Sequence, residues 1–230
     1  MSQIICESIV VTKGEFPAIC DATFHIEGPG ACFIVVTGEN GSGKTTLLKS
    51  IAGINPITRG KMTVNDTDVK KNVIDLKRTA TYIGHEFNYL NQFKVLEHLE
   101  LNQKLDLHSR TNVKEIEGFK ILSISEALDF CRLSKRKNLF IEDLSVGQQR
   151  RLQLACAFMR STDLVLIDEP HAGLDANSKD VFDELFGQQF ISGRSLIIAT
   201  HDAKRILHLA TDFLEIKNGV VNHVKNVQDI

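Results

Sequence analysis

The fold follows from Gly38-Glu39-Asn40-Gly41-Ser42-Gly43-Lys44-Thr45, which matches the pattern G-x-x-x-x-G-K-[ST] in full. The apolar run Phe33 to Val36 precedes this segment, and the helix-forming run Thr45 to Leu48 follows it. Glycines let the backbone bend so that successive N–H groups point at phosphate oxygens, and the dipole of a following helix adds partial positive charge. The segment therefore predicts a strand, a phosphate-binding loop and a helix in that order.

The side chains of this loop suit a nucleoside triphosphate with Mg²⁺. Lys44 is expected to reach the β- and γ-phosphates, and the Thr45 hydroxyl to ligate Mg²⁺, a hard cation that prefers oxygen ligands. A glycine-rich turn with a surface lysine is the structural alternative. The predicted nucleotide-binding residues are those of the loop and the start of the helix: Gly38, Glu39, Asn40, Gly41, Ser42, Gly43, Lys44, Thr45 and Thr46.

A second segment, Leu164-Val165-Leu166-Ile167-Asp168-Glu169, consists of four apolar residues followed by two carboxylates. This pattern suits a buried central strand whose carboxyl end places acids beside the phosphates. Asp168 is expected to hold Mg²⁺ directly or through water. Glu169 points differently and is expected to polarise an attacking water, an assistance typically worth roughly 10²–10⁴-fold in rate. An apolar strand ending in two acids is weak evidence alone and strong evidence when a phosphate loop accompanies it.

The composition is that of an ordinary globular chain. Its 230 residues (25.7 kDa) suffice for a sizeable core and favour one compact α/β domain. Subtracting 29 acidic from 27 basic residues leaves a net charge of −2, so no bulk cationic field exists to hold nucleic acid or anionic lipid. With 43% hydrophobic and 24% charged residues, the disordered, collagen-like and disulfide-scaffold classes are excluded.

Cysteine, histidine and apolar patterns exclude further classes. The five cysteines are odd in number and include no C-x-x-C, which argues against a disulfide framework or thiolate metal site and favours a reducing compartment. The eight histidines form no H-E-x-x-H or C-x-x-C-H motif. The longest apolar stretches are strand-sized, far below the roughly 20 residues that span a bilayer. We expect neither a membrane span nor a targeting segment.

The predicted elements change in character along the chain. The first part is rich in short strands and contains one helix from Lys44 to about Ala52, with Gly53 suited to its C-cap. From about Phe87 to Arg160 the pattern indicates a helical insert, within which the polar run Lys104 to Lys120 predicts a solvated loop or a weak helix. A helical pattern around Ser178 to Leu185 then separates two strands and predicts a parallel βαβ unit. The expected strands are Ile4 to Thr12, Ala22 to Ile26, Ala31 to Thr37, Gly60 to Val64, Ala80 to Ile83, Leu164 to Ile167 and Ser195 to Ala199.

Between the phosphate loop and the acid pair lies Leu144-Ser145-Val146-Gly147-Gln148-Gln149-Arg150-Arg151, which resembles the L-S-G-G-Q signature of the ATP-binding-cassette (ABC) ATPases. Ala172-Gly173-Leu174-Asp175 is similar to that family's D-loop, and Thr200-His201-Asp202 to its switch-histidine segment. The motifs stand in the family's order across nearly the whole chain. The resemblance implies an α/β fold, the phosphate-loop NTPase fold of ABC ATPases, with a mixed-sheet core, an N-terminal antiparallel β subdomain and an inserted helical subdomain. Residues 1–230 are then a single nucleotide-binding domain, with approximately 87–160 as the helical subdomain that carries the signature.

The resemblance also implies a mechanism that one chain cannot complete. In this family two nucleotide-binding domains pack head to tail, with each ATP between the phosphate loop of one and the signature of the other. Ser145, Gly147 and Gln148 are then expected to bind the partner's nucleotide. The implied catalytic residues are Glu169, Lys44 and His201, with the histidine hydrogen-bonded to the γ-phosphate. The family places an aromatic residue about twenty positions before the phosphate loop, so Phe16 is the candidate for stacking on adenine, an ordinary packing phenylalanine being the alternative.

Two positions depart from the family pattern. In Tyr82-Ile83-Gly84-His85-Glu86, Glu86 stands where the family carries a glutamine that approaches Mg²⁺. A carboxylate can still ligate the metal but adds a negative charge beside a triphosphate, and Gln92 is a less well placed substitute. Val146 replaces a glycine of the signature.

Within the family, the Tyr82 to His85 run and the signature helix are most similar to the CcmA subfamily, the ATP-binding subunits of haem-handling transporters in cytochrome c maturation. This resemblance implies integral membrane partner subunits and a peripheral location at the cytoplasmic or mitochondrial-matrix face of a membrane. It implies ATP and Mg²⁺ as cofactors and no direct haem binding.

Two alternative hypotheses about the function are the ATPase subunit of a different importer or exporter, and a soluble ABC ATPase that takes no part in transport. Soluble members usually carry tandem cassettes, coiled-coil insertions or basic arms, and none is visible here. The short basic cluster Lys135-Arg136-Lys137 is interpreted as a solvated helix end, so no nucleic-acid partner is expected. A phosphate-loop kinase is disfavoured, because a kinase requires neither the signature segment nor a switch histidine.

Overall fold

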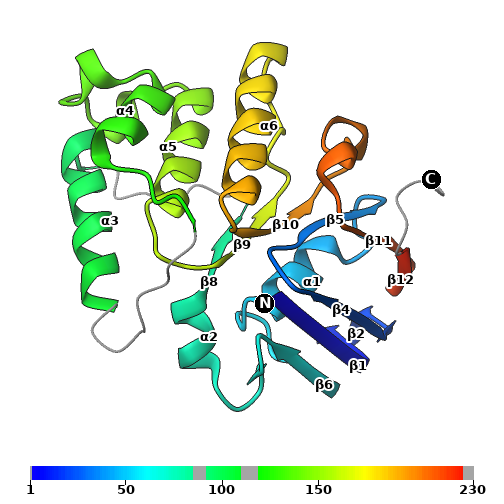
Figure 1. Cartoon of the computed structure of the whole chain (residues 1–230). Helices are drawn as coiled ribbons and strands as arrows, with labels where there is room; N and C mark the ends of the chain where they lie inside the picture. The colour runs from blue at the N-terminus through cyan, green and yellow to red at the C-terminus, as the bar shows by residue number, and fades with distance from the viewer. Residues whose placement is uncertain (1, 85–91, 110–118, 225–230) are drawn as a thin grey trace.

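The computed structural model describes residues 2–84, 92–109 and 119–224. Two sheets and a group of helices make up these residues (Figure 1). The first sheet is antiparallel and is built on β1 (Ser2–Lys13), which pairs with β2 (Phe16–Ile19), β4 (Phe24–Gly28) and β6 (Arg59–Val64). β7 (Thr67–Asp68) extends it beside β6. The N-terminal part of the chain therefore forms the antiparallel β region expected from the sequence.

The second sheet has the strand order β3-β12-β11-β5-β10-β9-β8 and is mixed. Its parallel part contains β11 (Asp212–Lys217), β5 (Phe33–Gly38), β10 (Ser195–Ala199), β9 (Leu164–Asp168) and β8 (Ala80–Ile83). β12 (Val220–Val224) runs antiparallel to β11, and β3 (Asp21–Ala22) pairs in parallel with β12. The mixed-sheet core of the fold prediction is confirmed.

The helices differ in which strands they adjoin along the chain and in where they lie in the molecule. α1 (Lys44–Ile51) follows β5, and the short α2 (Val73–Thr79) precedes β8. α3 (Val95–Ser109), α4 (Ile124–Cys131) and α5 (Val146–Phe158) lie together on one side of the molecule, and α6 (Ala176–Ile191) stands beside them (Figure 1). Short 3₁₀ turns occupy Ser134–Arg136, Ile141–Asp143, Ala203–Arg205 and Leu207–Leu209. None of the helices in the described residues combines the length and apolarity needed to cross a bilayer.

β5 divides the interior into two cores because its side chains alternate between opposite faces. Ile34 and Val36 pack with α1 and the first sheet, whereas Phe33 and Val35 pack with the cluster beneath α5 and α6. All four are fully buried. A parallel strand that is covered on both faces has apolar residues at every position, and the run Phe33 to Val36 before the phosphate loop follows this pattern.

Most expected elements are confirmed, with shifts at their ends. The helix predicted from Lys44 ends at Ile51, and Gly53 follows its C-cap with a φ of 67°. The β9–α6–β10 unit is parallel, as predicted. The polar run from Lys104 to Lys120 is helical up to Ser109 as the end of α3, and residues 110–118 lie outside the described part.

One strand prediction is wrong in its details. The run Ala22 to Ile26 is not one strand, because the chain passes from one sheet to the other at Thr23. Asp21 and Ala22 belong to β3 of the second sheet, and Phe24 begins β4 of the first. The Thr23 hydroxyl accepts a hydrogen bond from the Ser8 N–H at 3.1 Å and donates to Asp21 at 3.3 Å, which fixes the crossing. Alternating apolar residues do not show which sheet a strand joins.

Aromatic packing under α6 generates a stability prediction. Phe186 lies within ring-contact distance of Phe158, Phe182 and His171, and it is fully buried. Phe186→Ala should lower the free energy of unfolding by about 3–5 kcal/mol, measured by urea denaturation, because it leaves a cavity among rigid neighbours. Phe16→Ala is the matched control, since Phe16 is 77% exposed, and it should change stability by less than about 0.5 kcal/mol. Equal effects of the two substitutions would contradict this account of the core.

The entry into α1 generates a second prediction. Gly43 precedes the helix with a φ of 114°, and a Cβ there would lie 2.6 Å from the Ala18 carbonyl oxygen of β2. Gly41 also has a positive φ, of 81°, but a Cβ there would meet nothing within 4 Å. Gly41→Ala should therefore cost about 1 kcal/mol from backbone strain alone. Gly43→Ala should cost a further 1–3 kcal/mol, roughly, from overpacking, visible as a lower urea midpoint. If both variants unfold at the same midpoint, contact with β2 does not explain the glycine.

Candidate nucleotide-binding site

The loop between β5 and α1 surrounds the ammonium group of Lys44. The residue is only 6% exposed, and its side chain bends back so that Nζ donates to the carbonyl oxygens of Gly38 at 2.8 Å and Glu39 at 3.2 Å. A buried charge needs such partners because removal from water is costly. Lys44 therefore forms a fixed positive centre at the start of α1, where the helix dipole also favours an anion.

The carboxyl end of β9 brings Asp168 to the same place. The Thr45 hydroxyl donates to Asp168 Oδ2 at 2.6 Å, and the Tyr82 hydroxyl donates to the same oxygen at 3.3 Å. Asp168 is 2% exposed, and its other oxygen, Oδ1, is buried with no hydrogen-bond partner among the described residues. A buried carboxylate oxygen without a donor is rare and costly, and oxygen atoms of this kind are the ligands that Mg²⁺ prefers.

Asp168 and Thr45 therefore fit a Mg²⁺ site that is shared with a ligand. Across the described ranges, no three His, Cys, Asp or Glu side chains gather closely enough to hold a metal ion by themselves. Mg²⁺ is commonly bound by one or two protein oxygens together with waters and substrate phosphates. The donor set present here agrees with that kind of site.

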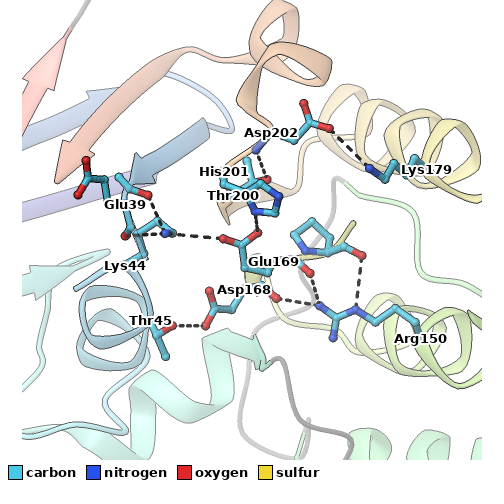
Figure 2. A network of polar contacts seen from close by, with 12 residues as sticks. Glu39, Lys44, Thr45, Arg150, Asp168, Glu169, Lys179, Thr200, His201 and Asp202 are labelled. Carbon is cyan, nitrogen blue, oxygen red and sulfur yellow. Dashed lines mark hydrogen bonds and ion pairs between the residues drawn. The ribbon is translucent and has the colours of Figure 1, made fainter. Parts of the chain in front are cut away.

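Glu169 lies between a cation and a histidine. Its Oε1 is 3.7 Å from Lys44 Nζ, and its Oε2 is 2.8 Å from His201 Nδ1 (Figure 2). The Glu169 side chain is 18% exposed, whereas that of His201 is 65% exposed. Three residues from distant parts of the sequence thus meet at one carboxylate, which lies at the boundary between the loop and solvent.

The backbone of Glu169 is strained. Its φ is 47°, a left-handed conformation that costs a non-glycine residue on the order of 1 kcal/mol. Its N–H donates to the Ala199 carbonyl of β10 at 2.8 Å. This turn after β9 directs the Glu169 side chain toward Lys44 and His201, while the Asp168 side chain contacts Thr45. Strain of this kind is often found where a side chain must be held in a functional direction.

Two hollows that share several lining residues surround these groups. One is lined by loop residues together with Asp168, Glu169, Ala172 and His201. The other is lined by the same acid pair and by residues of β1, β2, the loop and the start of α1: Lys13, Ala18, Asn40, Gly41, Gly43, Lys44, Thr45 and Thr46. The phosphate loop, the acids and the histidine that were singled out in the sequence are therefore brought together.

The other candidate residues lie elsewhere. Ser145 caps α5 and forms a capping box with Gln148, in which each side chain meets the other residue's backbone N–H at 3.0–3.3 Å. Gly147 follows in the first turn, and Val146 is 61% exposed. Neither Phe16 nor these signature residues line the hollows described above. Phe16 directly precedes Pro17 and Ala18, which line a third hollow beside the loop. Glu86 lies outside the described residues, and Gln92 is exposed.

The segment after the acid pair is organised by Asp175. This residue caps α6 by accepting from the Ser178 N–H at 2.8 Å and the Ser178 hydroxyl at 3.1 Å. These two hydrogen bonds, with a smaller contribution from the charge of Arg151, hold the pKa of Asp175 below its ordinary value. Arg151 in turn donates to the Ser178 hydroxyl at 2.7 Å. The D-loop is thereby tied to α5 of the same chain.

Sequence reasoning missed three residues at or near the site: Lys13, Tyr82 and Arg150. Lys13 ends β1 and lines the hollow beside the loop. Tyr82 lies in a strand, where nothing in the sequence distinguishes it from a packing residue. Arg150 belongs to the quoted signature segment, but its neighbours in space come from other strands. These contacts depend on which strands adjoin one another, which a single sequence does not state.

Comparisons with known proteins agree with this geometry. The family model described as ABC transporter matches residues 27–172, more than half of the chain. The chain is 28% identical over 200 residues to the cytochrome c biogenesis ATP-binding export protein CcmA of Xanthomonas axonopodis pv. citri, covering 87% of each chain. It is 30% identical over 199 residues to the Fe(3+) ions import ATP-binding protein FbpC of Fusobacterium nucleatum, covering 86% of this chain and 52% of the relative.

A solved structure with the same fold is the dimeric, post-hydrolysis state of the ATP-binding cassette MJ0796 bound to ADP and Pi. It superposes with a TM-score of 0.77 at 21% identity and covers 98% of both chains. The strand–loop–helix with its buried lysine, the acid pair at the end of β9 and the family match lead to one assignment. The chain belongs to the ABC transporter family and is one of its ATPase subunits.

Proposed function

We propose that this subunit hydrolyses ATP as a head-to-tail dimer that drives integral membrane subunits, in a transporter of the CcmA type. The observation that carries the chemical part is the position of Glu169 between Lys44 and His201, one residue after Asp168. This arrangement supplies a phosphate-binding cation, a base and an orienting group within one small site. Residues 1–230 act as one nucleotide-binding domain, in which approximately 87–160 is the helical subdomain containing α3, α4 and α5.

In the proposed reaction Lys44 binds the β- and γ-phosphates and the loop N–H groups surround them. The carboxylate of Glu169 accepts a proton from the attacking water, and His201 holds that carboxylate in place. Thr45 and Asp168 would hold Mg²⁺, and Glu86 is proposed as a further ligand from its position in the sequence, where the family carries glutamine. Mg²⁺ supplies positive charge against the triphosphate when bound. Phe16 stacks on the adenine, for which its exposed ring is suited.

The ion pair between Lys44 and Glu169 has a consequence for binding. At 3.7 Å the carboxylate is a counter-ion of the same ammonium that the phosphates need. Phosphate oxygens and Glu169 therefore compete for Lys44 when ATP binds. Neutralising Glu169 removes both the base and this competitor, so the variant should hold ATP without turning it over.

The arrangement of the signature residues supports a dimer. Ser145, Gly147 and Gln148 lie at the N-terminus of α5 and not among the residues that line the hollows at the chain's own phosphate loop. A helix N-terminus favours an anion, so this end of α5 suits the γ-phosphate of a nucleotide bound to a second copy. The fold neighbour described above is itself dimeric with ADP and Pi, which adds support.

The likeness to CcmA supports the haem-handling assignment, in which the chain acts at the cytoplasmic or mitochondrial-matrix face of a membrane and binds no haem itself. Hydrolysis would then drive release of haem from a membrane haem-handling protein. FbpC is similar at 30% identity, so the ATPase subunit of another importer or exporter is the second candidate.

The first test of this proposal is Glu169→Gln. Turnover of ATP with Mg²⁺ should fall by roughly 10²–10⁴-fold, the usual contribution of a general base. ATP should convert the variant to a stable dimer, measured by light scattering after size-exclusion chromatography. Glu100→Gln is the matched control, because Glu100 is exposed on α3, and it should behave as wild type. Equal turnover of wild type and Glu169→Gln would refute the assignment of Glu169.

The second test addresses the transporter. Depleting the chain in its native organism should lower the amount of holocytochrome c, measured by haem staining, while the apoprotein persists. Wild type and Glu100→Gln should restore the holoprotein, and Glu169→Gln should not, because only turnover is missing. Normal holocytochrome c after depletion would reject the CcmA-type role and favour another importer or exporter, with the ATPase chemistry unaffected.

A further inference from the structure

Arg150 joins α5 to the turn that carries the acid pair. Its side chain leaves the second turn of α5, is 3% exposed and extends to the end of β9 (Figure 2). Nη2 donates to the carbonyl oxygens of Asp168 at 2.7 Å and Glu169 at 2.9 Å, and Nε donates to that of Pro170 at 3.5 Å. One guanidinium thus binds three consecutive backbone carbonyls.

The other edge of the guanidinium reaches Gly84, the residue directly after β8. Nη1 donates to the Gly84 carbonyl at 2.7 Å and to the Gln153 side-chain oxygen one turn along α5. A planar guanidinium has five N–H donors in a fixed arrangement, whereas a lysine ammonium is a compact group on a flexible stem. Arg150 can therefore bridge two strand ends and its own helix, and lysine cannot reproduce this set of contacts.

The backbone that Arg150 binds is the strained one. Glu169 has a φ of 47°, and its N–H is fixed by the Ala199 carbonyl of β10. The carbonyl side of the same residue is fixed by Arg150. Without this second attachment, the peptide after Glu169 could rotate toward a less strained conformation. The carboxylate would then leave its position between Lys44 and His201.

The same arginine lies close to the signature residues. Ser145 caps α5 and Arg150 follows five residues later, so the two belong to one rigid, hydrogen-bonded stretch of helix. A displacement of the N-terminus of α5 is therefore transmitted to the carbonyls of Asp168 and Glu169. In a head-to-tail dimer these two ends of the chain serve different nucleotides.

We propose that Arg150 is a positioning residue that couples the signature end of α5, which faces one nucleotide, to Glu169, which acts on the other. This inference rests on the proposed dimeric ATPase mechanism. Arg150 does not line the hollows at the phosphate loop, so it affects the rate of hydrolysis through the direction of Glu169. Its effect on ATP binding is at most a small tightening, because a displaced Glu169 competes less with phosphate for Lys44.

The test compares Arg150→Lys with wild type in the 230-residue chain. The kcat for MgATP hydrolysis should fall by about 10- to 100-fold, as a small misplacement of a catalytic group does. The KM for ATP should change by less than about threefold, because Lys44 and the loop are untouched. In the Glu169→Gln background, Arg150→Lys should leave the ATP-dependent dimer intact.

Arg194→Lys is the matched control. Like Arg150, Arg194 is a buried arginine that donates to backbone carbonyls, those of Phe158 at 3.3 Å and Arg160 at 2.8 Å. It has no part in the site, so its substitution should lower thermal stability without changing kcat in the folded protein. Any loss of kcat that is specific to Arg150→Lys then reports positioning.

Several outcomes would overturn the inference. They are an unchanged kcat in Arg150→Lys, an equal fall of kcat in Arg194→Lys, and loss of the ATP-dependent dimer together with kcat, which would show a merely structural role.

If Arg150→Lys does not fold, Gln153→Ala is the deciding variant, since it removes a side-chain partner of Arg150. A normal kcat in this variant refutes the inference, and a lowered kcat with unchanged KM supports it. If wild type itself does not hydrolyse ATP, the proposed function fails and not this coupling alone.

Discussion

The parallel alignment of β5, β10 and β9 is the constraint on which the site depends. In register, Val36 of β5 lies opposite Ala199 of β10, which lies opposite Asp168 of β9. Three carboxyl ends therefore meet at one edge of the sheet, and each contributes a different group. β5 leads into the phosphate loop, β9 ends in the acid pair, and β10 ends just before His201. The hydrogen bond from Thr45 to Asp168 joins residues that are 123 positions apart in the sequence. The two residues meet because only β10 separates β5, which leads into the loop before Thr45, from β9, which ends at Asp168.

Burial makes the chemistry of this edge possible. Lys44 and Asp168 are almost inaccessible, and both are charged groups whose transfer from water is costly. Lys44 is compensated by two loop carbonyls and by Glu169, and Asp168 by two hydroxyls. Within the described residues no donor compensates Asp168 Oδ1. A polar site that is partly satisfied by the protein alone is prepared for a ligand that completes it.

The signature residues and the acid pair are connected through α5. The residues at the capped N-terminus of this helix do not line the hollows at the phosphate loop of the same chain, while its arginines contact the turn after β9 and the start of α6. Arg150 binds backbone carbonyls, and Arg151 binds the hydroxyl of Ser178 beside Asp175. In the proposed dimer, one short helix thus has contacts that are relevant to both nucleotides.

The sequence by itself determined the local order of elements. Glycine spacing from Gly38 to Gly43 predicts the phosphate loop, and the apolar runs before Gly38 and Asp168 predict buried parallel strands, because these properties depend on neighbouring residues only. Tertiary structure alone decided which strands adjoin, where the chain crosses between sheets at Thr23, and that Lys13, Tyr82 and Arg150 lie near the acids. Long-range strand order and the reach of a buried side chain depend on the packing of the whole core, and no local pattern encodes them.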